Sequence, residues 1–268
     1  MKRANLAIVT VFGLGALGLA SLAAYPDKIE ATSKIVSLKI SSDRTNYKLG
    51  EVVKLSIELK NESENNLVIH DVFGVGDGSV RVFISSDGKT YPEYSPGWGQ
   101  MDFASTNTII KPNESIVSSA DVLWHSKPNA IKGESDAVVK EVAKKTLLTD
   151  YAFPEAGIYF IKATYTYNES LESEPIQITM TEPVGEDLEV WNKIKNRGEF
   201  AFFIQNDYFQ IDYKPEERAK FQKEIENILI DHPTSLYAES LRQSLEKFRA
   251  SEAKRQDFLR NLQKQKPQ

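Results

Sequence analysis

The amino-acid sequence predicts a mainly β fold, an antiparallel β-sandwich, followed by a small all-α helical module. Three observations support this prediction. Between residues 33 and 181, apolar and polar residues alternate with period two in one segment after another. After residue 186 the apolar residues follow the period of an α-helix instead. The chain contains no cysteine, so apolar cores rather than disulfides must hold both parts together.

The β-strands are predicted in the order of the period-two segments, about seven to nine in all, with the spacing of a sandwich. The clearest segment is 51–63, which ends in a polar Asn-Glu-Ser turn. Its apolar face would consist of Val53, Leu55, Ile57 and Leu59. Other strands are predicted in 35–41, 66–73, 80–94, 114–124 and 174–182. Residues 80–94 are predicted to form a hairpin, because Asp87 and Gly88 supply the positive φ angles of a tight turn. Residues 135–145 are expected to form a short helical insertion.

A further strand, FPEAGIYFIKATYTY at 153–167, alternates with period two after a turn. Residues 155–159 have the spacing acid-x-Gly-x-Tyr, which resembles the tyrosine corner of immunoglobulin-like sandwiches. In that corner a tyrosine hydroxyl bonds back to the backbone just upstream. The resemblance implies a structural role for Tyr159 and places Ile161 where antibody domains have their second disulfide cysteine. It is a resemblance to the cysteine-free immunoglobulin-like domains of bacterial secreted proteins, and it implies such a domain over residues 33–181.

A helical module is expected over residues 186–264. In the first helix, Leu188, Trp191 and Ile194 would share one face. In the second, Pro215 stands at a favoured first-turn position with acidic residues behind it. The apolar stripe of the second helix would be Phe221, Ile225, Ile228 and Leu229, and that of the third helix Leu241, Leu245 and Phe248.

The second and third helices are expected to form an antiparallel hairpin. Pro233 ends the second helix, and Thr234 or Ser235 can cap the third after a very short turn. Residues 231–248 resemble the helical joints of tetratricopeptide-like bacterial envelope proteins. Only one such joint is present and no repeat of about 34 residues can be marked, so a single hairpin is expected. The tail 249–266 has six Lys and Arg against two acids, which indicates a solvated helix end or contact with an anionic envelope surface.

Residues 1–24 are predicted to be a secretory signal peptide. Lys2 and Arg3 form a charged start, an uncharged run follows to Ala24, and small residues lie where a signal peptidase would cleave. The alternative is an uncleaved anchor, because the uncharged run approaches the ~20 residues that span a bilayer. Tyr25 replaces the cysteine of a lipobox, so no lipid anchor is expected. The protein is expected to be exported, periplasmic or extracellular, and to meet a membrane only through this segment if it is uncleaved.

No motif in the sequence indicates a catalytic or metal site, and no cofactor is expected. The three histidines, His70, His125 and His232, do not have the spacing of zinc ligands. A G-x-S-x-G motif is absent, and the glycine-rich 74–79 lacks the lysine and the helix of a phosphate loop. The net charge of −5 argues against a nucleic-acid partner, which would need a basic surface.

One segment, 90–103, is a candidate ligand-binding loop. Prolines and glycines predict a surface loop there, and its aromatic residues are Tyr91, Tyr94, Trp98 and Phe103. Exposed aromatic rings can stack on sugar rings or anchor a protein partner. The alternative is that these rings fold back as a lid over one end of the sandwich.

The sequence therefore favours an exported, non-enzymatic binding or adaptor protein of the bacterial envelope. It would recognise an envelope protein or a glycan through the sandwich loops, the helical module or both. This interpretation depends on the absence of catalytic motifs and on analogy between folds. The alternatives are a secreted hydrolase with dispersed catalytic carboxylates and a sandwich-type protease inhibitor.

Overall fold

The computed structural model describes residues 36–69, 73–75, 79–96, 107–126, 150–166, 170–209 and 214–264. Residues Lys34–Gln268 form one compact unit, in which the strands and the helices contribute to one hydrophobic core. The predicted signal peptide 1–24 and the predicted insertion 135–145 lie outside the described residues. Among the helices that are described, none is both long and apolar enough to cross a membrane.

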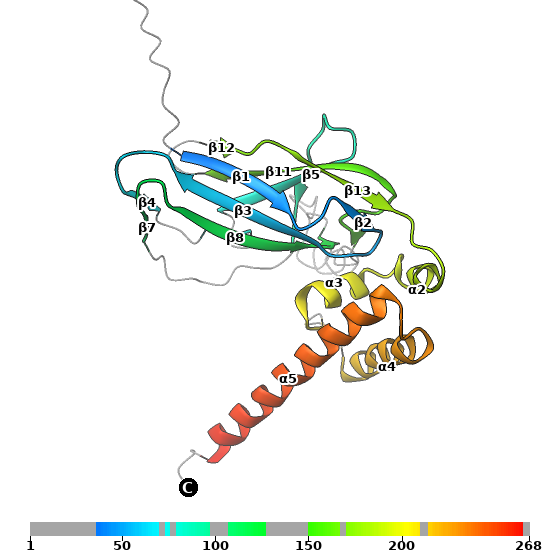
Figure 1. The fold of residues 1–268 in the computed structure, drawn as a ribbon. Helices are drawn as coiled ribbons and strands as arrows, with labels where there is room; N and C mark the ends of the chain where they lie inside the picture. Colours follow the sequence, from blue (N-terminus) through cyan, green and yellow to red (C-terminus); the bar gives the residue numbers. More distant parts are fainter. Residues whose placement is uncertain are drawn as a thin grey trace, which may run out of the picture. The chain divides into compact units, whose positions relative to one another are not determined.

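Two β-sheets form the sandwich (Figure 1). The first sheet has the order β1-β3-β8 and consists of β1 (Val36–Ser42), β3 (Val53–Asn61) and β8 (Ser115–Val122). The second has the order β2-β13-β11-β5-β6, with β12 paired to β11. Its strands are β2 (Asn46–Lys48), β5 (Val80–Ser85), β6 (Glu93–Tyr94), β11 (Gly157–Thr166), β12 (Ser170–Glu172) and β13 (Ile176–Thr181).

The strand order is that of an immunoglobulin-like sandwich and confirms the predicted fold class. Strands β1, β3 and β8 correspond to A, B and E, and β5, β11 and β13 correspond to C, F and G. Within these two sheets the described pairs are antiparallel, apart from the parallel pair of β2 and β13. Two short ladders complete the β structure: β4 (Leu67–Ile69) pairs with β7 (Thr108–Ile110), and β9 (Trp124–His125) with β10 (Asp150–Tyr151).

The core between the sheets follows the period-two pattern. The predicted face of β3 is buried along its whole length. On β11 the alternate residues Tyr159, Ile161, Ala163 and Tyr165 are buried in the same way. Alternation predicts the core because successive side chains of a strand point to opposite faces of the sheet.

The predicted hairpin of β5 and β6 is present, but its turn differs in detail from the expectation. Gly88 has a φ of +70°, whereas Asp87 contributes its side chain instead of a positive φ. The Asp87 carboxylate accepts hydrogen bonds from the backbone N–H groups of Lys89 and Thr90, each at 2.8 Å. An aspartate side chain that bonds its own turn in this way fixes the loop without strain.

Four helices are described after β13: α2 (Glu186–Ile194), α3 (Gly198–Asn206), α4 (Pro215–Asp231) and α5 (Leu236–Lys264). The buried face of α2 consists of Val190, Trp191 and Ile194, whereas Leu188 is 38% exposed. The predicted face was therefore wrong at Leu188. At about 100° per residue, Leu188 lies more than a quarter turn away from the centre of the face that packs.

Helix α3 was not predicted, because five consecutive apolar residues, 200–204, do not distinguish a short helix from a buried strand. Its residues Phe200, Ala201, Phe202, Phe203 and Ile204 are all buried. The helix packs against β9 and β10 at the end of the sandwich and against α5 on its other side. A short apolar run of this kind is consistent with either a buried strand or a buried helix, so length and periodicity did not decide between them.

Helices α4 and α5 form the predicted helical hairpin. Pro215 is the first residue of α4, and the stripe residues Phe221, Ile225 and Ile228 are buried. In α5, Leu241 and Leu245 are buried, and the Ser235 hydroxyl accepts a hydrogen bond from the N–H of Tyr237 at the start of the helix. The helix is longer than the predicted apolar stripe and continues to Lys264.

Candidate functional site

A cleft of about 900 Å³ lies where the sandwich meets the helices. One wall is the turn of the β5–β6 hairpin, around residues 86–93. A second wall is the segment 151–155, which leads from β10 into β11. The third wall is the C-terminal part of α2, with Trp191 and Lys195. Segments that are far apart in the sequence therefore enclose one space.

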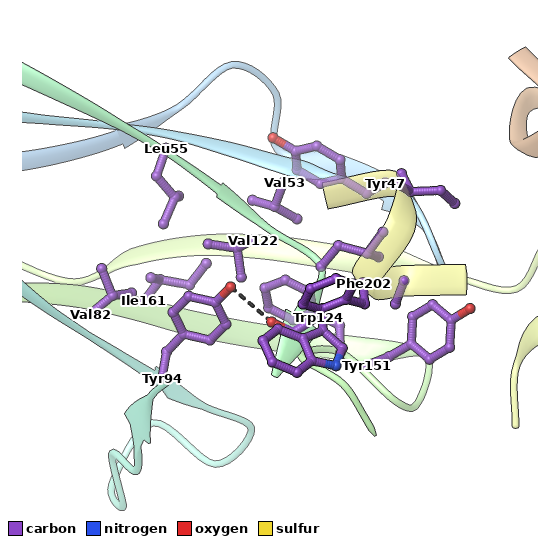
Figure 2. Packing of buried hydrophobic residues seen from close by; sticks show 14 of the residues in the cluster. Tyr47, Val53, Leu55, Val82, Tyr94, Val122, Trp124, Tyr151, Ile161 and Phe202 are labelled. Atoms are coloured by element: carbon purple, nitrogen blue, oxygen red, sulfur yellow. Dashed lines mark hydrogen bonds between the residues drawn. The ribbon is translucent and has the colours of Figure 1, made fainter. Parts of the chain in front are cut away.

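Buried aromatic rings form the floor of the cleft. Tyr94, Tyr151 and Trp191 line it, yet each is at most 5% exposed. The Tyr94 hydroxyl donates a hydrogen bond to the carbonyl oxygen of Trp124 at 2.9 Å (Figure 2). The Tyr151 hydroxyl donates to the carbonyl oxygen of Ile194 at 3.1 Å, and its ring meets that of Trp191 edge-on. Burial raises the pKa of both tyrosines, so these hydroxyls stay protonated and act as fixed donors.

The structure separates the members of the predicted aromatic loop. Tyr94 pairs with Val82 across the β5–β6 ladder and so points into the core, which corrects its assignment to a surface patch. Tyr91 is half-buried, and the Lys162 ammonium lies 4.5 Å from the centre of its ring. Trp98 and Phe103 lie outside the described residues. Of the two described members, Tyr91 and Tyr94, only Tyr94 lines the cleft.

The rim of the cleft is acidic. Its charged residues are the carboxylates Asp87, Glu93, Glu155 and Glu182 and the ammonium group of Lys195. Hydrogen bonds from the N–H groups of Thr90 and Lys89 lower the pKa of Asp87 to about 2, so it is charged at neutral pH. Glu93 forms an exposed ion pair of 3.7 Å with Arg81. Glu155 and Glu182 are both exposed.

Of the two histidines that the structure describes, one lines the cleft. The Nδ1 atom of His125 accepts a hydrogen bond from the N–H of Ser95 at 3.1 Å, and the ring stacks on Tyr94. His232 lies at the C-terminal end of α4, where Lys193 donates to its Nε2 atom at 2.7 Å. His70 lies outside the described residues. In the part of the chain that the structure describes, no cluster of three metal-ligating side chains occurs.

Tyr159 lies at the edge of the cleft and has the geometry expected of a tyrosine corner. Its hydroxyl donates to the carbonyl oxygen of Glu155 at 2.9 Å. This bond holds the segment 151–155 against the start of β11. Tyr159 is buried, so it positions the acidic wall rather than offering a surface to a ligand.

A glutamine that was not predicted to be important fixes the sandwich end to the helices. The Oε1 atom of Gln205 in α3 accepts hydrogen bonds from the N–H groups of Leu123 and Trp124, both at 2.8 Å. It also accepts the Tyr94 hydroxyl at 3.3 Å. The sequence offers no signal for this role, because the partners of Gln205 lie more than 80 residues away in the chain.

Gly50 and Tyr237 close the contact between the sandwich and the helices on the side opposite Gln205. This contact region is called the joint. Gly50 has a φ of +81°, and a Cβ atom there would lie 2.7 Å from the Trp191 ring and 2.8 Å from the Tyr237 ring. The Tyr237 hydroxyl donates to the carbonyl oxygen of Leu49, which lines the cleft. Lys48 and Asp187 form an ion pair of 2.7 Å beside these contacts. The cleft therefore has rigid walls.

No protein-family model and no curated protein sequence matches this chain. Parts of it are similar to solved structures. A β-glucosidase from Erythrobacter marinus is 14% identical with a TM-score of 0.27, over 55% of this chain and 15% of that chain. A CARDB domain from Pyrococcus furiosus, in complex with di-metal ions, is 11% identical with a TM-score of 0.27, over 55% of this chain and 94% of that one. A sporulation control protein from Bacillus subtilis is 11% identical with a TM-score of 0.29, over 60% and 55% of the two chains.

The matched region spans only 15% of the β-glucosidase. At such low TM-scores, neither the glycosidase nor the CARDB domain supports an argument about activity or ligand. The tetratricopeptide-like resemblance of residues 231–248 gains no support, since no family model matches the chain. The function must therefore be argued from the cleft itself.

Proposed function

We propose that this protein is a non-enzymatic binding protein whose cleft holds a positively charged segment of a partner protein. The observation that supports this proposal is the composition of the cleft, in which four carboxylates and one ammonium group surround a floor of aromatic rings. A lysine or arginine side chain suits such a site. Its apolar stem packs on the rings while its charge meets the carboxylates.

The position of the cleft also supports binding. Its walls come from a sandwich hairpin, from the corner before β11 and from α2, and hydrogen bonds fix each wall. A site with fixed walls loses little conformational entropy when its ligand binds. With the predicted signal peptide 1–24, we expect the partner to be another exported protein of the envelope.

A labelled peptide tests this proposal. The lysine probe is a fluorescein-labelled octapeptide of alternating lysine and glycine, and the glutamate probe has glutamate in place of lysine. We expect fluorescence anisotropy to rise when the full-length protein is titrated into the lysine probe and to stay unchanged with the glutamate probe. The affinity for the lysine probe should fall as the salt concentration rises, because salt screens exposed charges.

Two paired variants locate the binding site. The double variant Glu155→Gln with Glu182→Gln removes two charges of the cleft, and at about 0.5 kcal/mol each should weaken binding about fivefold. The control Glu174→Gln with Glu216→Gln removes two exposed charges outside the cleft and should leave the affinity unchanged. Equal binding of both probes, or equal weakening by both double variants, would contradict the proposal.

A hydrolase is the second candidate, because the cleft places several carboxylates and His125 in one space. Dispersed carboxylates of this kind can act as acid and base when they flank a bond. Incubation of the protein with isolated envelope material tests this candidate. Release of soluble products that stops in the Glu155→Gln variant would favour the hydrolase over the binding protein.

A further inference from the structure

In the outer half of α5, residues 249–264, the described side chains pack little against the rest of the protein, although Arg249 forms an ion pair of 2.6 Å with Glu226 of α4. In the inner half, Tyr237, Leu241 and Leu245 are buried against the other helices. Beyond Phe248 the described side chains are exposed apart from the half-buried Glu252. Phe258 is 63% exposed and Leu259 is 41% exposed. An isolated helix of about 15 residues is only marginally stable in water, so this segment lacks the packing that normally holds a helix.

The outer half of α5 has a charge opposite to that of the remainder of the chain. Residues 249–264 contain five Lys and Arg and two acids, a net charge of +3. The whole chain has a net charge of −5, so the remainder has a net charge of −8. A charge contrast of this kind suits the basic segment to an acidic partner.

The cleft has the complementary chemistry. Its four carboxylates and one ammonium group give it a net charge of −3, and its floor is aromatic. In the outer half of α5, Lys254 lies four residues before Phe258 and Arg255 lies four residues before Leu259, so each basic residue adjoins an apolar one on the helix surface. Basic and apolar groups therefore lie together on α5, and acidic and apolar groups lie together in the cleft.

The tail of a copy cannot enter its own cleft. The start of α5 is fixed at the joint, where the N–H of Leu236 donates to Asp187 at 2.9 Å and the Tyr237 hydroxyl donates to Leu49. From there the helix runs for 29 residues, about 43 Å, away from the sandwich (Figure 1). Its outer half is thus directed away from the cleft that Leu49 lines, and only a second copy can supply a tail.

We propose that the outer half of α5 from one copy docks in the acidic cleft of a second copy. This inference rests on the proposed function, because it identifies the positively charged segment that the cleft binds. Each copy has one tail and one cleft, so a reciprocal exchange between two copies closes a two-fold dimer. In such a dimer both clefts are occupied, and a basic partner must displace the tails in order to bind.

Sedimentation velocity of the full-length protein over a range of concentrations tests the dimer. We expect a dimer at low salt that dissociates as the salt concentration rises. The tail variant, Lys254→Glu with Arg255→Glu, and the cleft variant, Glu155→Lys with Glu182→Lys, should each weaken dimerisation about tenfold or more. The control Lys220→Glu with Lys223→Glu reverses two exposed charges on α4 and should remain dimeric. Circular dichroism of each variant checks that it is folded.

Mixing the two variants gives a sharper test. The tail variant has an intact cleft and the cleft variant has an intact tail, and the reversed tail and the reversed cleft are again opposite in charge. A mixture should therefore dimerise more tightly than either variant alone. Addition of the lysine probe should dissociate the wild-type dimer. A wild-type protein that is monomeric at every concentration, or a dimer that survives in both variants, would overturn the inference.

The outcomes separate this inference from the proposed function. A monomeric protein that still binds the lysine probe in its cleft would refute tail exchange and leave the binding function in place. A protein that is monomeric and binds no lysine probe would refute both. A monomer that sediments with phosphatidylglycerol vesicles, but not when Lys254 and Arg255 are reversed, would assign the tail to a lipid surface and refute the exchange.

Discussion

Substitution of Gly50 by alanine should disrupt the joint that forms the cleft. A methyl group at this position would lie 2.7 Å from Trp191 and 2.8 Å from Tyr237, and neither ring can move freely because both are buried. The φ angle of +81° adds backbone strain of about 1–2 kcal/mol for a residue with a side chain. Overpacking of a buried site adds about 1–3 kcal/mol. We therefore expect Gly50→Ala to lower the free energy of unfolding by about 2–5 kcal/mol.

The control for this variant is Gly88→Ala in the β5–β6 turn. Gly88 has a similar φ of +70°, but its Cβ atom would lie no closer than 3.2 Å to the half-buried ring of Phe160. It should therefore show the backbone cost of about 1–2 kcal/mol without most of the packing cost. Urea unfolding of the full-length proteins, followed by tryptophan fluorescence and circular dichroism, measures both. If Gly50→Ala lowers the free energy of unfolding by no more than Gly88→Ala does, the tight packing of Gly50 against α2 and α5 is refuted.

Three further substitutions test other contacts of the joint, each by urea unfolding of the full-length protein. Gln205→Leu leaves the N–H groups of Leu123 and Trp124 without an acceptor and should lower the free energy of unfolding by about 2–4 kcal/mol. The exposed control Gln243→Leu should change it by no more than about 0.5 kcal/mol. Tyr159→Phe removes the hydrogen bond to Glu155 and should cost about 1 kcal/mol, and a cost near zero would argue against a tyrosine corner. Asp187→Asn removes the ion pair with Lys48 and should destabilise the protein at pH 7, and a difference from the wild type that does not shrink as the pH falls below about 4 would contradict this account.

The pH dependence of Asp187 follows from the direction of its pKa shift. Partial burial alone would raise the pKa of Asp187, but hydrogen bonds from Lys48 and from the N–H of Leu236 lower it below its ordinary value of 3.8. A group whose pKa is lower in the folded state stabilises that state fully above its unfolded pKa. The contribution is lost as the pH falls through the lower folded value. The difference between Asp187→Asn and the wild type should therefore shrink at pH values below about 4.

Much of the fold could be predicted from the sequence because two simple periods determine it. The alternation in 51–63 predicted the buried face of β3, and the stripe from Phe221 to Ile228 predicted that of α4. Helix α3 was missed because its short run of five apolar residues fits a buried strand as well as a helix. Leu188 was assigned to the wrong face of α2. Trp191 and Ile194 can share a face with Leu188 or with Val190, and the structure buries Val190.

The cleft could not be predicted, because sequence periodicity does not show which loops meet. Asp87, Glu155 and Glu182 come from three different loops and lie together only once β11 pairs with β5 and β13. Tyr94 was recognised as an aromatic residue of interest, but its orientation depends on its pairing with Val82. The sequence did reveal the basic charge of residues 249–266. Its contrast with an acidic cleft becomes visible only in the structure.

Hydrogen–deuterium exchange of the full-length tail variant, Lys254→Glu with Arg255→Glu, whose cleft is not occupied by a tail, tests the central claim most directly when it is measured with and without the lysine probe. If the cleft binds a positively charged segment, the probe should slow exchange in the backbone of residues 86–93, 151–155 and 190–196, which form its three walls. Exchange in the distant strands β1 and β8 should stay unchanged. Protection confined to other segments, or no protection at probe concentrations that saturate the anisotropy signal, would contradict the account.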